Sequence, residues 1–464
     1  MTKRIAAHNR AGRKENKPAA VFSVVEPNAA GIDIGATEIY VAVPADRDPQ
    51  PVRSFPTFTA DLGRVAEWLK ACGIETVAME STGVYWVPLF QILESRGMRV
   101  CLVNAQHVKN VPGRKTDVAD CQWLQYLHSV GLLRASFRPP DEICAIRSLW
   151  RHRNDLLQMA AAHIQHMHKS LDQMNVQLQH VISDITGDTG MAIVDAILAG
   201  QRDPQQLAKF RDPRIKVSED VIARSLVGDW RPEHLFTLRQ AVQAWRHYER
   251  LIAECEEEVR QYLDRWQPPA DLPPLPPSGK SRKARQKYEP AFDLRSRMYN
   301  AFGVDLTQIP GIGVLTAQVL FSEVGCDFSA FRSASAFASW LALCPDNRKS
   351  GGKILRSRTR KRKNRVAIAL RMAAQGLLRS QSALGDFCRR MRAKLGSAEG
   401  ITAAAHKLAR IIYHVVTKRE PYEESKLVKL TAQTRDLNRL KKAAARLGHQ
   451  LIPLTREVHP EGVS

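Results

Sequence analysis

The sequence lacks any run of about 18 uncharged apolar residues, the length that a helix needs to cross a membrane. Its basic start, residues 1–20, also lacks an apolar core of signal-peptide length. We therefore expect neither a membrane span nor secretion. Closely spaced cysteine pairs, which zinc and redox sites usually need, are missing as well. The eight cysteines stand singly and are expected to be reduced thiols in a cytoplasmic protein.

Acidic residues are scarce beside basic ones. The chain has 47 Asp and Glu against 69 Lys and Arg, which gives a net charge of +22. Residues 341–464 hold 28 of the basic residues and 9 of the acidic ones, so this segment alone carries +19. A solvated face that keeps a protein soluble explains a modest excess, but it explains this concentration poorly. The charge indicates a polyanionic partner, of which nucleic acid is the commonest.

The first third of the chain alternates between strand-like and helix-like spacing of apolar residues. We expect three strands, a helix, a strand, a helix, a strand and a helix, in the segments GIDIG, EIYVAVP, PVRSFPTF, 61–72, TVAME, VYWVPLFQILESRG, MRVCLVN and DVADCQWLQYLHSVG. Thr116 stands where it could cap the last helix. This order suits a mixed sheet with helices on its faces, and it can build an α/β ribonuclease-H-like fold.

Four carboxylates in this region form a candidate metal site. Asp33 lies inside the strand GIDIG, Glu80 closes the strand TVAME, and Asp117 and Asp120 are three positions apart on the following helix. Half-buried carboxylates that converge at one sheet edge repel one another unless something compensates them. Mg²⁺ or Mn²⁺ would do so, because hard cations favour oxygen ligands, and two such ions stabilise the attacking and leaving oxygens of phosphodiester chemistry. Each acid alone also fits a cap, a turn or a surface charge.

The segment GIDIGAT has a second interpretation. Residues 33–37, Asp-Ile-Gly-Ala-Thr, match the phosphate loop of actin-like ATPases and sugar kinases. That function needs two further nucleotide-binding glycine loops in a duplicated domain, and we find neither. The basic C-terminal half has no place in it either.

The C-terminal part carries two further motifs. The segment IPGIG, with Gly311 and Gly313, followed by VLTAQVLFSEVG, is typical of a helix-hairpin-helix, although a plain turn between packed helices is equally compatible. Further on, KSGGK is expected to be a flexible loop that places Ser350 between two lysines. A serine among cations can act as a nucleophile on a phosphodiester, but it more often merely contacts a phosphate. The expected nucleic-acid contacts are Gly311, Gly313, Lys349, Lys353, Arg356, Arg358, Arg360, Lys361, Arg362, Lys363 and Arg365.

These patterns divide the chain into six parts. They are a disordered basic N-terminus (1–28), the α/β domain (29–140), a long helical coiled-coil or dimerisation region with an insertion (141–266), a proline-rich and basic linker (267–290), a mostly helical domain with the helix-hairpin-helix (291–420) and a helical tail (421–464). Between the two long helices of the third part, at about 141–180 and 233–266, we expect a polar, less regular stretch.

The motifs resemble those of the DEDD transposases of bacterial insertion sequences, recombinases that a structured bridge RNA guides in better-studied members. The resemblance covers residues from about 30 to 420. It rests on GIDIG, AMESTGVYW, VNAQHVKNVPGRKTDVADC, IPGIG, SAFASWLALCP, the SGGK loop and the basic run before RMAA. The stretch from about 181 to 290 is longer than in compact members.

The resemblance implies an N-terminal domain of the Holliday-junction resolvase type and a cytoplasmic, nucleoid-associated enzyme that cuts and rejoins DNA. Asp33, Glu80, Asp117 and Asp120 would bind Mg²⁺ or Mn²⁺, and Ser350 would become covalently joined to DNA. Ser357 is the next candidate, because the spacing after SGGK aligns poorly. Acids and serine would meet from different subunits of a homo-oligomer, a dimer or tetramer, with a non-coding guide RNA as a further partner.

Three other functions compete with this one. A resolvase-like nuclease would use the same metals but form no covalent adduct with DNA. A non-catalytic nucleic-acid-binding protein would not need the four acids. An actin-like ATPase or kinase would bind a nucleotide in the N-terminal domain.

Overall fold

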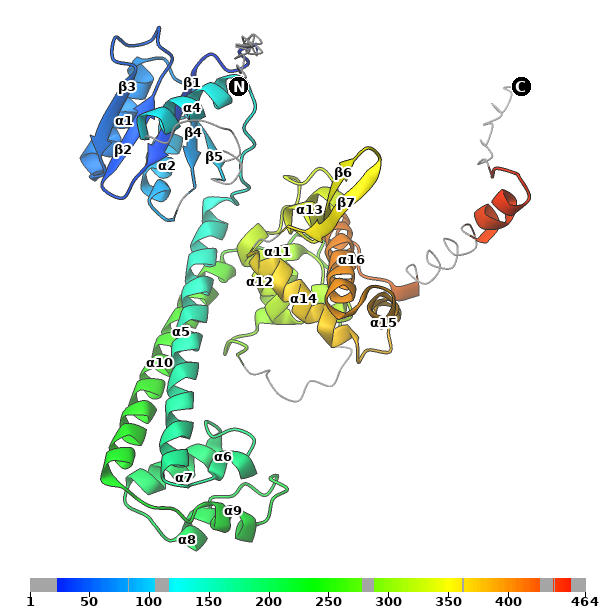
Figure 1. Cartoon of the computed structure of the whole chain (residues 1–464). Helices are drawn as coiled ribbons and strands as arrows, with labels where there is room; N and C mark the ends of the chain where they lie inside the picture. Colours follow the sequence, from blue (N-terminus) through cyan, green and yellow to red (C-terminus); the bar gives the residue numbers. More distant parts are fainter. Residues whose placement is uncertain are drawn as a thin grey trace, which may run out of the picture. The chain divides into compact units, whose positions relative to one another are not determined.

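A computed structural model of the chain describes residues 23–81, 83–104, 117–277, 288–360, 363–425, 437 and 439–451. It comprises two compact units, Met1–Arg138 and Pro139–Ser464 (Figure 1). Most of the expected disordered N-terminus, the expected cap Thr116 and most of the expected helical tail lie outside the described residues.

The N-terminal unit is built on one mixed sheet of five strands, as the spacing of apolar residues predicts. The strands are β1 (Ala29–Ile34), β2 (Glu38–Ala42), β3 (Val52–Pro56), β4 (Thr76–Glu80) and β5 (Arg99–Val103). Their order in the sheet is β3-β2-β1-β4-β5. The first three strands pair antiparallel, whereas β4 lies parallel to both β1 and β5. The carboxyl ends of β1 and β4 therefore lie side by side.

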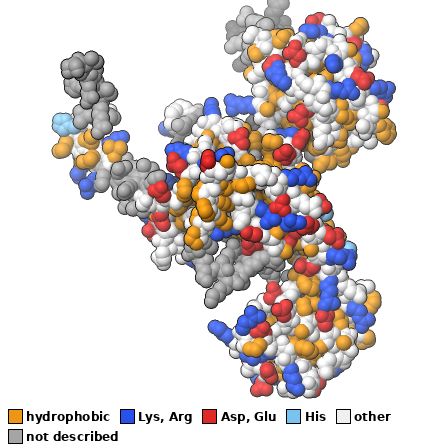
Figure 2. Space-filling model, turned by 180° about the vertical axis from the view of Figure 1, so that it is seen from behind, with side chains coloured by type: hydrophobic (Ala, Val, Ile, Leu, Met, Phe, Trp, Pro, Cys, Tyr) orange, Lys and Arg blue, Asp and Glu red, His pale blue; other side chains and the backbone are white. Residues whose placement is uncertain are grey.

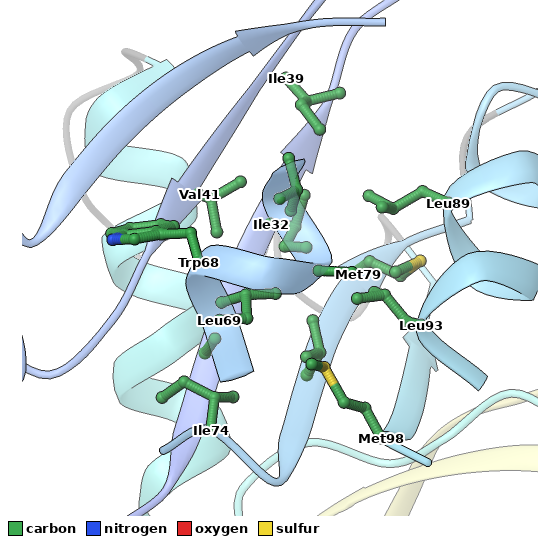
Figure 3. Close-up of a cluster of buried hydrophobic side chains, with 14 of the residues drawn as sticks. Ile32, Ile39, Val41, Trp68, Leu69, Ile74, Met79, Leu89, Leu93 and Met98 are labelled. Atoms are coloured by element: carbon green, nitrogen blue, oxygen red, sulfur yellow. The ribbon is translucent and has the colours of Figure 1, made fainter. Parts of the chain in front are cut away.

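One face of this sheet carries the hydrophobic core. Helices α1 (Thr59–Ala71) and α2 (Trp86–Ser95) cover it and contribute buried leucines. Ile32 of β1 and Met79 of β4 are fully buried there and point toward these helices (Figure 3). Because successive side chains of a strand alternate between faces, the neighbours of Ile32 and Met79 emerge on the other side of the sheet.

The other face is covered by α4 (Asp117–Ser129), which packs directly on β1. A Cβ atom added at Gly31 would lie 2.3 Å from the carbonyl oxygen of Cys121 and from the amide nitrogen of Gln125. Only glycine permits so close an approach of helix and strand backbones. At the other end of the helix, the imidazole of His128 is hydrogen-bonded to the hydroxyl of Thr76 at 2.9 Å. The start of α4 thus lies toward the carboxyl ends of β1 and β4.

The second unit begins with two long helices that pack side by side, α5 (Asp141–Gln173) and α10 (Pro232–Asp264) (Figure 1). We call this pair, with the helices at its tip, the arm. The expected irregular stretch at the tip is instead α6 (Leu178–Val181), α7 (Asp188–Leu198), α8 (Pro204–Ala208) and α9 (Glu219–Ser225). Short apolar runs pack these helices into a core that they share with the ends of α5 and α10, and Ile193, Leu207 and Ile222 belong to it. Basic and acidic side chains alternate over the surface of the tip (Figure 2).

The rest of this unit is the C-terminal body, which is mostly helical as expected. Its elements are α11 (Leu294–Phe302), η1 (Leu306–Gln308), α12 (Val314–Val324), α13 (Ala334–Trp340), β6 (Pro345–Ser350), β7 (Lys353–Thr359), α14 (Arg365–Leu377), α15 (Ala383–Leu395) and α16 (Ser397–Lys418). Phe328, Phe331, Phe337 and Tyr413 form an aromatic cluster that joins α16 to the segment around α13.

Ion pairs attach this body to the arm. Arg151 of α5 donates two hydrogen bonds, of 2.9 and 2.7 Å, to the carboxylate of Glu323 on α12. Arg147 donates to the carbonyl oxygens of Ser322 and Glu323 at 3.2 and 2.7 Å.

All eight cysteines are free thiols. Among the described helices, none combines the length and apolar character that a membrane crossing requires.

Candidate functional site

Two of the four predicted acids lie on adjacent parallel strands of the N-terminal sheet. The register of β1 and β4 pairs Gly31 with Ala78 and Ile32 with Met79, so the next pair in register is Asp33 and Glu80. Ile32 and Met79 belong to the core face, and strand alternation therefore directs Asp33 and Glu80 to the face that α4 covers. Both acids are only partly buried.

The third acid comes from α4. Asp120 is half-buried, one residue before Cys121, whose carbonyl oxygen approaches Gly31 of β1. The pKa of the buried Cys121 thiol is raised to about 12, chiefly by burial, and the negative charges of Asp33 and Asp120 act in the same direction. Both carboxylates are thus close enough to Cys121 to act on its thiol.

The arrangement nevertheless stops short of a closed metal centre. Among the described residues, no three His, Cys, Asp or Glu side chains stand together in a group that could hold a metal ion. Asp117 is the first residue of α4, but its side chain lies outside the described part of the chain, as do residues 105–116 before it. The donors that do gather at this end of the sheet are carboxylate oxygens, which suit Mg²⁺ or Mn²⁺.

Gly31 and Cys121 support this site, and sequence reasoning missed them. Both lie within segments that were singled out for their acids. A glycine in the middle of a strand often marks a close approach of another backbone, and Gly31 shows this relation with α4. The first glycine of GIDIG, placed inside a strand-like segment, is therefore the signal that could have identified this contact.

The second glycine of GIDIG has a structural role as well. A Cβ atom at Gly35 would lie 2.4 Å from the carbonyl oxygen of Glu38, and the amide of Gly35 donates a hydrogen bond of 3.0 Å to the same oxygen. Gly35 thus closes the tight turn between β1 and β2. Beside it lies a mainly apolar cleft of about 230 Å³, whose lining includes Val84 and Tyr85. The turn explains this glycine without a bound nucleotide.

Ser350 lies at the tip of a β-hairpin, so the expectation of a flexible loop there is wrong. Strands β6 and β7 pair antiparallel, with Ser350 opposite Lys353. Gly351 and Gly352 form the two-residue connection with φ angles of 53° and 76°. A two-residue turn with two left-handed residues suits the twist of a hairpin and is favoured by glycine. The side chains of Ser350 and of Ser357 on β7 are both exposed.

The predicted basic contacts lie on this hairpin and in the segment after it. Lys353, Arg358, Arg360 and Lys363 have exposed side chains, and Arg360 donates a hydrogen bond of 3.0 Å to the hydroxyl of Ser339. Arg365 starts α14, 3.9 Å from Glu323. The side chains of Lys349, Arg356, Lys361 and Arg362 lie outside the described residues.

The two glycines of IPGIG differ in their surroundings. Gly311 has a φ of 88°, and a Cβ atom there would lie 3.0 Å from the carbonyl oxygen of Ala373 on α14. Gly313 is the residue that precedes α12. The backbone angle at position 311 and the packing on α14 therefore require a glycine there. A plain turn between packed helices explains both features as well.

Two transposase families match this chain. Residues 30–176 match a family of DEDD transposases, and residues 305–389 match the transposase IS116/IS110/IS902 family. Together the matches cover half of the chain, and they contain the acids of the N-terminal sheet and the serine hairpin. No curated protein matches it. The class is that of enzymes which cut and rejoin DNA. Within this class, the chain belongs to the DEDD transposases of insertion sequences.

Proposed function

We propose that this transposase cleaves DNA with divalent metal ions held by Asp33, Glu80, Asp117 and Asp120. The observation that carries the proposal is the meeting of β1, β4 and α4 at one end of one sheet face. Asp33 and Glu80 are level on parallel strands. The pKa of the Cys121 thiol is raised chiefly by burial, and the negative charges of Asp120 and Asp33 both raise it further. The strand order β3-β2-β1-β4-β5, with three antiparallel strands first, supports a ribonuclease-H-like fold for this domain.

The donor set fits Mg²⁺ or Mn²⁺, because it consists of carboxylates without cysteine or histidine ligands. When bound, such ions stabilise the charge that develops on the attacking and leaving oxygens of a phosphodiester. The residues of the chain hold the acids in place. The hydrogen bond between His128 and Thr76 fixes one end of α4, and the close contact at Gly31 fixes its distance from β1.

The second step of the proposal assigns the nucleophile to Ser350. Its hydroxyl oxygen forms a bond to the DNA phosphorus while the bond to one bridging oxygen of the phosphodiester breaks. The hydroxyl proton leaves to a base, and the released DNA oxygen takes up a proton. The exposed position of Ser350 at the end of the β6–β7 hairpin, opposite Lys353, supports this role. Acids from another subunit of a dimer or tetramer would supply the activation, and a guide RNA would select the site.

Replacement of Asp33 by Asn tests the metal site. We expect strand cleavage of the element's DNA ends to fall about 100-fold or more, the scale at which loss of one charge-stabilising group slows an enzyme. DNA binding should remain. The matched control is Asp46→Asn, an exposed acid of the same unit whose side chain is 75% accessible. Cleavage by Asp33→Asn at the wild-type rate refutes the metal site.

Denaturing gels test the serine. Ser350→Ala should abolish the covalent protein–DNA adduct, whereas Ser357→Ala should retain it. An adduct that survives in Ser350→Ala and disappears in Ser357→Ala moves the nucleophile to the second serine. Cleavage by the wild type without any adduct instead identifies a resolvase-like nuclease, and it leaves the metal site standing.

A further inference from the structure

Helix α16 presents a row of basic side chains outside the basic tract considered so far. The row begins with the adjacent residues His406 and Lys407. Arg410 follows three positions after Lys407, and His414 follows four positions after Arg410. At this spacing the four side chains share one face of the helix. The opposite face is buried through Leu408 and Ile412 among others. No Asp or Glu occurs in the sequence from 400 to 419. We call these four residues the α16 cation face, in which Lys407 and Arg410 carry the charge.

Arg410 is the centre of this face. Its positive charge lowers the pKa of His406, Lys407 and His414, in each case second to burial. Lys407 and His406 are half-buried. Within the described part of the chain, neither Lys407 nor Arg410 makes an ion pair with a carboxylate. These cations therefore lie beside one another without internal compensation.

The face continues into the base of the serine hairpin. Burial raises the pKa of the Cys344 thiol, just before β6, and the positive charges of Arg360 and Arg410 both oppose that rise. Arg360 is in turn fixed by its hydrogen bond to Ser339 at the end of α13. Packing of α13 on α16 brings these groups together. Arg360, at the end of β7, and Arg410, in the middle of α16, thus both lie near Cys344.

Such an arrangement works against folding. Partial burial disfavours the charged form of a lysine, and a second cation beside it adds repulsion. A structural role would be served better by an apolar residue or by a carboxylate partner. An anion from outside the chain would remove both penalties. Perturbed charges of this kind are common at functional sites.

We propose that the α16 cation face binds the phosphodiester backbone of a nucleic-acid strand, with Lys407 and Arg410 as the phosphate contacts and Arg360 extending the surface toward the hairpin. This inference rests on the proposed action on nucleic acid, but it concerns binding rather than cleavage. The contacts are sequence-independent, because phosphates carry no base information.

The test is the salt dependence of binding by Lys407→Gln/Arg410→Gln in the full chain. On duplex DNA the slope of log K against log salt should fall by about 0.9 for each phosphate contact removed, and thus by about 2 for the double variant. The matched control is Lys216→Gln/Arg224→Gln, which removes two exposed cations from the tip of the arm. Its slope should equal that of the wild type. Arg410→Lys, which keeps the charge, should retain most of the affinity.

The slope is measured on three nucleic acids: random-sequence duplex DNA, single-stranded DNA and structured RNA. A smaller slope on duplex or single-stranded DNA assigns the face to DNA, and a smaller slope on RNA alone assigns it to RNA. Unchanged slopes on all three nucleic acids overturn the proposal. An equal decrease in slope for the control Lys216→Gln/Arg224→Gln also overturns it, since net charge would then explain the effect. Failure of Asp33→Asn to abolish cleavage bears only on the metal site, because binding is measured here without turnover.

Discussion

The arm and the C-terminal body are both helical and rich in arginine, yet they treat their positive charges differently. On the arm, Arg246 pairs with Asp195 at 2.6 Å, and Arg260 pairs with both Glu257 and Asp264. From β6 to the end of α16, the described ion pairs are those of Arg365 with Glu323 and of Arg389 with Asp386. The other described cations of that segment have no carboxylate partner.

This difference separates structural cations from those that serve a partner. A paired arginine contributes to folding through its ion pair with an Asp or Glu carboxylate. Removal of the arginine leaves that carboxylate unpaired. An unpaired, partly buried cation contributes little to folding or opposes it, so its removal should leave stability unchanged or raise it while weakening what binds from outside. The same substitution of a cation by methionine should therefore have opposite consequences in the two regions.

The largest effect on stability is expected for Arg153→Met on α5. Arg153 is 1% exposed and donates to Glu256 at 2.9 and 2.6 Å, while Glu256 also accepts from the amide of Ala291 at 2.8 Å. Loss of the arginine leaves a buried carboxylate without its partner, which costs about 3–5 kcal/mol. Chemical denaturation monitored at the arm measures this cost.

A double variant checks the reason for that loss. Arg153→Met/Glu256→Leu removes both charges and should recover much of the stability, because an apolar pair of similar volume replaces the ion pair. If the double variant is less stable than the single one, packing rather than the unpaired charge determines the cost.

A smaller loss is expected for Glu323→Gln at the junction of arm and body. Glu323 lies among Arg147, Arg151 and Arg365, and its neutralisation leaves these cations uncompensated. Hydrogen bonds to charged groups contribute about 1.5–3 kcal/mol, and the partial exposure of Arg151 places the loss toward the lower end. Amide hydrogen exchange in α12 should accelerate accordingly. Exchange as slow as in the wild type would show that the aromatic and apolar contacts hold the body alone.

The smallest effect on stability is expected for Lys407→Met on α16. The substitution keeps an apolar stem and removes a half-buried cation beside Arg410, so the unfolding free energy should stay within about 0.5 kcal/mol or rise. Thermal denaturation compares it with Arg153→Met. A loss as large as that of Arg153→Met would break the distinction between the two regions.

Much of the N-terminal sheet follows from the sequence, because its strands are short, largely apolar segments, and several are followed directly by glycine, serine or threonine. The segments GIDIG and TVAME become β1 and β4, and the spacing after position 116 becomes α4. Register could not be predicted. It depends on contacts far apart in the chain, such as that of Gly31 with α4, and it decides that Asp33 and Glu80 are level.

The C-terminal body was harder to predict. A pair of glycines after a serine fits both a flexible loop and a tight turn, and only the pairing of β6 with β7 distinguishes them. The short helices of the tip were missed because their apolar runs are brief. The α16 cation face was not predicted, because the lack of ion-pair partners for Lys407 and Arg410 is a tertiary property.

Anomalous diffraction from crystals of the full chain grown with Mn²⁺ tests the metal site most directly. We predict a peak at the carboxyl ends of β1 and β4, beside Asp33, Glu80 and the start of α4, and its loss in Asp33→Asn. A map without anomalous density at that position, at a Mn²⁺ concentration that supports DNA cleavage, would contradict the account.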